Sequence, residues 1–188
     1  MTIKGTGFLS RRSLLEESFG KPQLDALIDE LARTHRVFAR PILASTRIPM
    51  SPWMAFTEAV LERFYAGDEW AYWQFGQQSA DFALSGPYKN LVRNRDRAAF
   101  AQAVGTAWKL YYSRGRAVGT WQEDVMRYCI EEVPCPHTYL EYSACGWVSR
   151  GLELIGSAPV RTEILQGYSR GDSRVEYRFH CQAVAQTS

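Results

Sequence analysis

The stretch PVRTEILQGYSRGDSRVEYRFHC, residues 159–181, contains the pattern that decides the fold. In its second half apolar and polar side chains alternate with a period of two, which is typical of an antiparallel strand with one solvated face. The apolar positions are Val175, Tyr177, Phe179 and Cys181. Residues 159–168 supply a partner strand, and Gly171 in the segment 169–173 can take the positive φ of a turn. The chain is therefore predicted to contain a hairpin here.

Residues 136–156, which precede this hairpin, show a helical pattern. One face of the predicted helix is formed by Leu140, Ala144, Trp147, Gly151 and Ile155. The small residues Ala144, Gly146 and Gly151 would let this helix approach a sheet or another helix closely. Before it, residues 117–133 predict one long strand with Trp121, Val125 and Cys129 on one face.

The first half of the chain has helical periodicity, and caps, prolines and glycines divide it into five predicted helices. The first runs from Ser10 to Phe19, the second begins near Pro22, the third begins at Ser51 and Pro52 and ends near Gly67, the fourth covers 68–86, and the fifth lies between Asp96 and Gly115. Residues 34–50 have no sustained period, so they predict a connection with at most a short extended piece.

This order of elements is an α+β plan. With 188 residues and 46% hydrophobic content, the chain has enough apolar mass for one core but not comfortably for two. We therefore predict a single domain over residues 1–188. Its N-terminal helices, in residues 1–115, would pack on a C-terminal antiparallel sheet within a strand, helix and hairpin part, residues 116–184.

Charge and hydropathy exclude several classes of protein. The net charge of +2 is too small for the electrostatic field of a nucleic-acid binder. No apolar run approaches the roughly 18 to 20 residues that cross a bilayer, so membrane insertion is not expected. Ser10-Arg11-Arg12 is only superficially similar to a twin-arginine signal, because Glu16 and Glu17 occupy the place of its apolar region. We expect a cytoplasmic protein.

The cysteines and histidines do not predict a reaction. Cys129, Cys135, Cys145 and Cys181 contain no C-x-x-C pair, so we interpret them as small buried hydrophobic residues, with a shared metal site as the alternative. Cys135 and His137 are too close in sequence to predict a nucleophile with its base, and phosphate-loop and nucleophile-elbow motifs do not occur. We expect no catalytic residue, no metal, no cofactor and no enzyme activity.

Aromatic residues make up 13% of the chain and lie mainly on the predicted helices. The simplest interpretation is that these aromatic side chains form part of the hydrophobic core. The functional hypothesis is a cavity for a small apolar ligand, with a few polar anchors. Its predicted lining residues are Trp73, Trp108, Tyr112, Arg116 and Trp147. A third interpretation is an exposed aromatic patch for dimerisation or for another protein.

Arg93, Arg95 and Arg97 are interpreted as a solvated loop, with an acidic partner as the alternative.

Several short motifs resemble a paralogous family of uncharacterised myxobacterial proteins. They are IKGTGF at 3–8, LLEESFG at 14–20, WKLYYSRGR at 108–116, CGWVSRGLELIG at 145–156 and the Gly171-Asp172 turn. These proteins look related to a larger superfamily of haem nitric-oxide-binding domains, vinyl-reductase-like sensor domains and TRAPP tethering subunits. The resemblance implies helices packed on an antiparallel sheet, often dimeric, around an apolar cavity, but it does not define a function.

The sequence departs from these relatives at the residues that hold their haem and zinc. The haem domains hold iron through a histidine on a helix near the middle of the chain, but His35, His137 and His180 lie outside residues 52–114. Their propionate motif, Tyr-x-Ser-x-Arg, is met only approximately by residues 111–116. Vinyl-reductase-like sensors hold zinc with cysteines that flank the hairpin glycine, where this chain has Gly167 and Val175. Haem and this kind of zinc site are therefore not expected.

The sequence thus predicts a non-enzymatic sensory or regulatory domain in the bacterial cytoplasm that forms a homodimer and binds a small apolar ligand. The alternative is an adaptor or assembly subunit that binds another protein without a ligand. A haem-based gas sensor is the third hypothesis.

Overall fold

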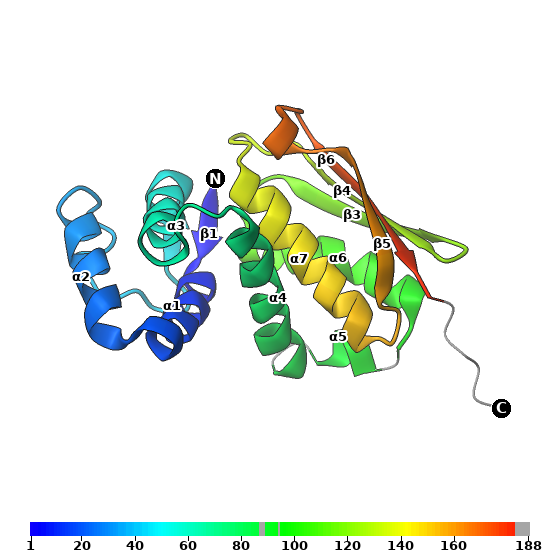
Figure 1. Cartoon of the computed structure of the whole chain (residues 1–188), viewed down its shortest axis with the longest axis horizontal. Coiled ribbons are helices and arrows are strands. Elements are labelled where there is room, and N and C mark those ends of the chain that lie inside the picture. The colour runs from blue at the N-terminus through cyan, green and yellow to red at the C-terminus, as the bar shows by residue number, and fades with distance from the viewer. Residues whose placement is uncertain (87–88, 94, 183–188) are drawn as a thin grey trace. The chain divides into compact units, whose positions relative to one another are not determined.

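The computed structural model describes residues 1–86, 89–93 and 95–182 (Figure 1). The chain divides into two compact units. Unit 1 comprises residues 1–71 and 110–113, and unit 2 comprises residues 72–109 and the chain from residue 114 onward.

Unit 1 is a small helical assembly with one pair of short strands. Its elements are β1 (Thr2–Lys4), α1 (Gly5–Phe19), α2 (Lys21–Ala32), β2 (Arg47–Pro49) and α3 (Met50–Tyr65). Strands β1 and β2 pair antiparallel, which confirms the short extended piece expected within 34–50. Phe8, Phe38 and Phe56 form the aromatic centre of its core, with ring centroids 5.1 to 6.0 Å apart.

Helices α1 and α3 begin earlier than predicted. The prediction that Ser10 caps the first helix is wrong, since α1 begins at Gly5. Gly5 donates its N–H to the carbonyl of Thr46 at 2.7 Å, and a Cβ at this position would lie 2.0 Å from the carbonyl oxygen of Leu43. This tertiary contact requires glycine and starts the helix there.

Apart from the first residues of α4 and the last of α6, the other elements belong to unit 2. They are α4 (Trp70–Ser85), α5 (Asn90–Arg93), α6 (Arg97–Tyr111), β3 (Arg116–Gln122), β4 (Val125–Glu131), α7 (Thr138–Leu154), β5 (Pro159–Gln166), the 3₁₀ helix η1 (Tyr168–Arg170) and β6 (Val175–Cys181). The carboxylates of Asp68 and Asp96 accept the N–H groups of Trp70 and Ala99, as the predicted caps require.

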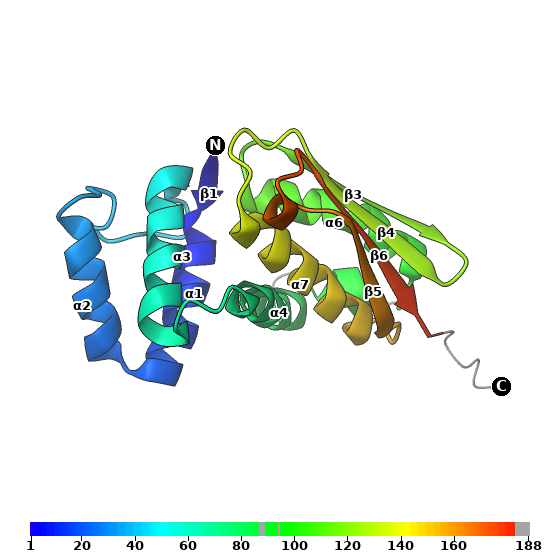
Figure 2. The same cartoon turned by 45° about the horizontal axis from the view of Figure 1, so that its top comes forward.

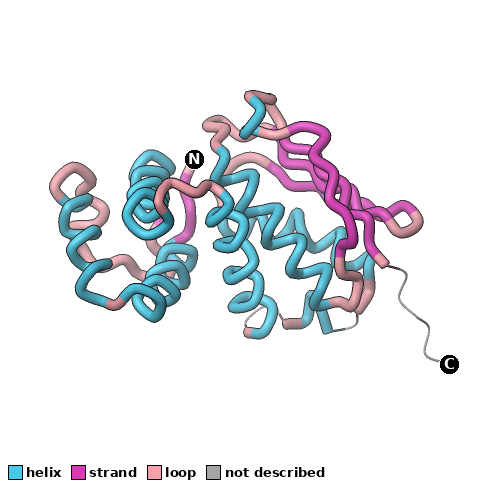
Figure 3. The backbone as a smooth tube through the Cα atoms, viewed as in Figure 1, coloured by secondary structure: helices cyan, strands magenta, loops and turns pink. Residues whose placement is uncertain are grey.

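The four strands of unit 2 form one antiparallel sheet in the order β3-β4-β6-β5 (Figure 3). Helices α6 and α7 cover one face of this sheet (Figures 1 and 2). The predicted C-terminal hairpin is confirmed: β5 pairs with β6, and Gly171 has a φ of +81° in the turn. Val175, Tyr177 and Phe179 are at most 1% exposed on the covered face. The predicted α+β class is therefore correct.

The single long strand predicted over 117–133 is wrong. The segment forms two strands that turn at Glu123 and Asp124, and Glu123 has a φ of +53°. As a result Trp121 pairs with Met126 on the covered face, whereas Val125 and Cys129 lie on the opposite face. The period-two pattern continues through the turn, so periodicity alone did not reveal it.

The uncovered face of the sheet is polar. Arg116 pairs with Glu131 at 2.6 Å and Arg127 pairs with Glu176 at 2.8 Å across neighbouring strands. Arg97, predicted in a solvated loop, instead donates to Ser157, Asp124 and the carbonyl of Gln182. Its guanidinium also lies 4.8 Å from the ring centre of Trp121. That prediction is wrong for Arg97, because three segments distant from it in sequence, at residues 121–124, 157 and 182, converge on its side chain.

None of the described helices combines the length and the apolar character needed to cross a bilayer.

Candidate functional site

Two aromatic rings from α6 and α7 stack in the interior of unit 2. The rings of Phe100 and Trp147 are almost parallel, with an interplanar angle of 7° and centroids 6.1 Å apart. Phe100 is fully buried and Trp147 is 8% exposed. Phe100 belongs to the apolar stripe of α6, and Trp147 belongs to the predicted buried face of α7. Helical periodicity therefore places both rings at the contact between the two helices.

Glycines let the helices around these two rings pack closely. A Cβ at Gly146 would lie 2.2 Å from the carbonyl oxygen of Trp73, and a Cβ at Gly76 would lie 2.0 Å from that of Ser143. Helices α4 and α7 thus touch backbone to backbone. Further along α7, a Cβ at Gly151 would lie 2.3 Å from the ring of Phe100. The predicted close approach of this helix is confirmed.

The indole N–H of Trp147 is the unusual feature of this layer. Nε1 is buried and has no hydrogen-bond acceptor among the residues that the structure describes. Buried donors are almost always paired, so an unpaired one is a candidate contact for a missing partner. We define the aromatic layer as Trp73, Phe100 and Trp147.

The five predicted site residues do not all meet. The backbone of Trp73 meets α7 at Gly146, the residue before Trp147, and the ring of Trp73 lies 6.3 Å from the ring of Tyr177 on β6. Trp108 lies two turns along α6 from Phe100, and its indole N–H already donates to the carbonyl of Arg114 at 3.1 Å. The role of Trp108 in a ligand site stays a prediction.

The two predicted polar anchors have other partners. Arg116 is exposed on β3 and pairs with Glu131 and Glu132, at 2.6 and 3.3 Å. Tyr112 belongs to unit 1, where it bridges to Ile3 of β1. The structure adds Phe100 and the indole N–H of Trp147, which has no acceptor among the described residues, to the predicted site. Phe100 was visible in the sequence only as one member of a helical stripe.

A buried carboxylate lies one and a half turns before Trp147 on α7. Glu141 is 0% exposed, and its oxygens accept hydrogen bonds from the hydroxyl of Tyr177 at 2.6 Å, the N–H of Ser169 at 2.8 Å and the hydroxyl of Ser169 at 3.1 Å. Burial raises the pKa of Tyr177, which keeps its phenol protonated and able to donate. These bonds tie α7 to β6 and to η1. An acidic residue inside an apolar helical stripe is the signal that sequence analysis missed.

His137, which was considered together with Cys135 for catalysis, contributes to the N-terminal cap of α7. The Nδ1 atom of His137 accepts the N–H of Tyr139 at 3.0 Å, so the imidazole caps α7. Cys135 is half-buried, whereas Cys129, Cys145 and Cys181 are buried as predicted. Burial raises the pKa of the Cys145 thiol well above its ordinary value, which disfavours the reactive thiolate.

No group of three or more His, Cys, Asp and Glu side chains arranged to hold a metal ion occurs in residues 1–86, 89–93 and 95–182.

No family model matches this sequence, and no curated protein matches it. Solved structures do match. An unliganded Fe(II) H-NOX protein from K. algicida has a TM-score of 0.75 at 11% identity, over 98% of this chain and 100% of that chain. An H-NOX protein from S. oneidensis in the Fe(II)NO state has a TM-score of 0.72 at 15% identity, over 96% and 99%. This chain has the H-NOX fold.

A third structure supports the same assignment of fold. The H-NOX domain from Shewanella oneidensis in the Fe(II)CO state, determined by NMR, has a TM-score of 0.72 at 13% identity. It is matched over 98% of its length by 95% of this chain. The predicted resemblance to haem nitric-oxide-binding domains is confirmed at the level of the fold.

The donor groups of this chain do not fit the haem that the H-NOX fold implies. Helices α4 and α6 contain no histidine, cysteine or methionine. His137 caps α7, and His180 lies 3.1 Å from Glu163 on β5. Two residues of the motif nearest to a propionate site also have other partners. Ser113 accepts the N–H of Thr2 in unit 1, whereas Arg116 is paired with Glu131 in unit 2.

Proposed function

We propose that this chain is a regulatory domain of the H-NOX fold that works without haem and binds a small, neutral, apolar ligand at the aromatic layer. The observation that carries the proposal is the buried N–H of Trp147, which lacks an acceptor in the described part of the chain. An unpaired buried donor costs about 1 to 3 kcal/mol. A ligand with one accepting oxygen or nitrogen would remove that cost.

The surroundings of Trp147 support a neutral ligand with a flat body. Phe100 stacks on the indole, and Trp73 lies at the neighbouring helix crossing. The buried charged residues of unit 2, within the described ranges, are Glu141 and Glu176, and both carboxylates already accept hydrogen bonds. An anionic ligand would find no buried cation here, and a charged group without a partner is strongly disfavoured in such an interior.

Ligand binding would act through linkage. Helix α7 carries Trp147, and on the same helix Glu141 bonds to β6 and η1. A ligand that prefers one packing of α7 on the sheet shifts the population toward that packing. The surface around η1 is then the part of unit 2 that reports the bound state.

The wider assignment extends the same proposal. We infer membership in the myxobacterial family that the motifs at 14–20 and 145–156 resemble, a sensory role in the bacterial cytoplasm, and assembly as a homodimer. We also infer that the chain has no enzyme activity. The alternative of a ligand-free adaptor subunit stays a prediction.

A thermal-shift experiment with acetophenone and related neutral aromatic ketones tests the ligand class. The full chain is compared with the variants Trp147→Phe and Trp108→Phe. The second variant is the matched control, because the N–H of Trp108 already has a protein acceptor. The wild type and Trp108→Phe should gain stability with ketone, and Trp147→Phe should gain less. Equal shifts in all three proteins, or no shift in any, would contradict the proposal.

Native mass spectrometry and absorption spectroscopy test the absence of haem. Protein purified from cells supplied with haem should show no Soret band and no added mass of one haem per chain. A stoichiometric Soret band would overturn the haem-free assignment.

A further inference from the structure

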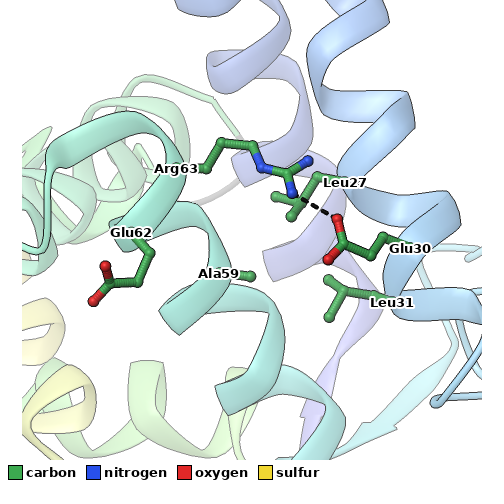
Figure 4. Close-up of a pocket in the computed structure, with 6 residues that line it drawn as sticks. All are labelled: Leu27, Glu30, Leu31, Ala59, Glu62 and Arg63. Carbon is green, nitrogen blue, oxygen red and sulfur yellow. Dashed lines mark hydrogen bonds and ion pairs between the residues drawn. The ribbon is translucent and has the colours of Figure 1, made fainter.

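A groove lies on the surface of unit 1 between α2 and α3 (Figure 4). Each helix contributes residues at positions i, i+3 and i+4, so the groove follows one turn of both helices. Its lining residues are Leu27, Glu30, Leu31, Ala59, Glu62 and Arg63, and its volume is about 320 Å³. That volume is at the lower end of the range for ligand sites, which suits one or two inserted side chains.

The groove has an apolar floor. Leu27 is 1% exposed, and Leu31 and Ala59 are half-buried. Ala59 is the smallest of these side chains and leaves the space between the helices unfilled (Figure 4). An apolar group that entered from solvent would cover Leu31 and Ala59 and so gain burial.

The rim of the groove carries an excess of negative charge. Arg63 of α3 donates to Glu30 of α2 at 2.6 Å, so the cation is already paired. Glu62 is exposed and has no ion pair with another described residue. Helices α2 and α3 together contain five acidic and two basic residues, a net charge of −3, although the whole chain has a net charge of +2. The helix pair is therefore an acidic surface on a weakly cationic protein.

We propose that this groove docks a basic amphipathic segment of a protein partner, which places a lysine against Glu62 and an apolar side chain against Leu31 and Ala59. Lysine suits the site because its alkyl stem can cover the floor while its ammonium stays at the rim. Acidic charge on both helices would also steer a cationic segment to this surface. The proposal does not depend on the ligand assigned to the aromatic layer.

Fluorescence anisotropy with the full chain tests the docking proposal. The probe is a fluorescein-labelled amphipathic helical peptide of leucine and lysine, and the matched probe replaces lysine with glutamate. We expect Glu62→Lys to weaken binding of the lysine peptide by about tenfold. Ala59→Leu, which fills the hollow, should weaken it by about fivefold. Glu17→Lys makes the same change of charge on an exposed site of α1 and should change binding by less than about twofold.

Other outcomes overturn the proposal. Equal weakening by Glu62→Lys and Glu17→Lys would mean attraction by net charge alone, and unchanged binding in Glu62→Lys and Ala59→Leu would place the peptide elsewhere. Amide chemical shifts should change at α2 and α3 when the lysine peptide binds. If spermidine displaces the peptide and produces the same shifts, the groove is a small-amine site and not a protein-docking surface. Circular dichroism confirms that each variant is folded before binding is measured.

Discussion

The hydroxyl of Tyr177 on β6 donates a 2.6 Å hydrogen bond to the carboxylate of Glu141 on α7, with both residues at most 1% exposed. Two further bonds from Ser169 complete the contact. An apolar contact between α7 and the sheet would tolerate sliding, whereas a buried carboxylate has acceptable partners in only one arrangement. The pair therefore determines where α7 sits on the sheet.

Replacing Glu141 should destabilise the protein strongly. In Glu141→Ala the hydroxyl of Tyr177 and the N–H of Ser169 lose their buried acceptor, which should cost about 3 kcal/mol. Glu153→Ala on the same helix removes a partly exposed ion pair with Arg150 and should cost less than about 1 kcal/mol. Denaturant unfolding of both variants measures the difference. Similar losses in the two variants would show that the buried hydrogen bonds do not determine the packing of α7.

A methyl group at Gly146 should separate α4 from α7. The added Cβ in Gly146→Ala meets the carbonyl oxygen of Trp73 at 2.2 Å, and backbone at a helix crossing cannot move aside cheaply. We expect the free energy of unfolding, measured by thermal denaturation, to fall by about 2 kcal/mol or more. Gly7→Ala in α1 is the matched control. Its Cβ meets the Cδ1 end of Ile3 at 3.2 Å, with ordinary contacts to Ile3 and Tyr111 at 3.6 and 3.9 Å, and the change should alter stability by less than about 1 kcal/mol. If Gly146→Ala is as stable as the wild type, the close crossing of α4 and α7 is not required for stability.

Acid should remove the contribution that the ionised carboxylate of Glu176 makes to the stability of the fold. Its hydrogen bond to Arg127 lowers the pKa of this carboxyl below the ordinary 4.5. A lowered folded-state pKa means that the ionised form stabilises the fold above pH 4.5 and that this contribution is lost as pH falls through the folded pKa. Glu176→Gln should therefore lose less stability on acidification than wild type, as measured by urea unfolding across this range. A Glu17→Gln control should retain the wild-type slope, and the same slope in Glu176→Gln would refute the prediction.

Alkali should weaken the fold through buried thiols and phenols. Burial raises the pKa of Cys181 from 9.0 to about 11, and it raises those of Tyr128 and Cys145 in the same direction. The folded state then keeps a proton that the unfolded state loses, so stability is complete below pH 9 and falls as pH rises toward 11. Urea unfolding of Cys181→Ala should show a shallower decline over this interval. Identical slopes for variant and wild type would exclude a contribution from Cys181.

Much of the fold follows from local patterns. The alternation of Val175 to Cys181 predicted both the strand and its buried face, and the stripe of α2 predicted a helix whose Leu24 and Leu27 are buried. Prediction failed where a distant contact decides the local structure. Gly5 begins α1 because of Leu43 and Thr46, and the turn at Glu123 and Asp124 keeps the alternation of the flanking strands.

The candidate site was likewise predicted only in part from local sequence patterns. Periodicity alone placed Trp73 and Trp147 on helices and Trp147 on a buried face, because a side chain's face follows from its position in the helical turn. Only the tertiary structure brought Trp73 to Gly146, stacked Phe100 on Trp147 and placed Tyr177 against Glu141. It also shows that no residue in the described part of the chain accepts the indole N–H of Trp147. These relations join elements far apart in the chain, and their geometry depends on packing and hydrogen bonding between elements, which a local sequence pattern does not contain.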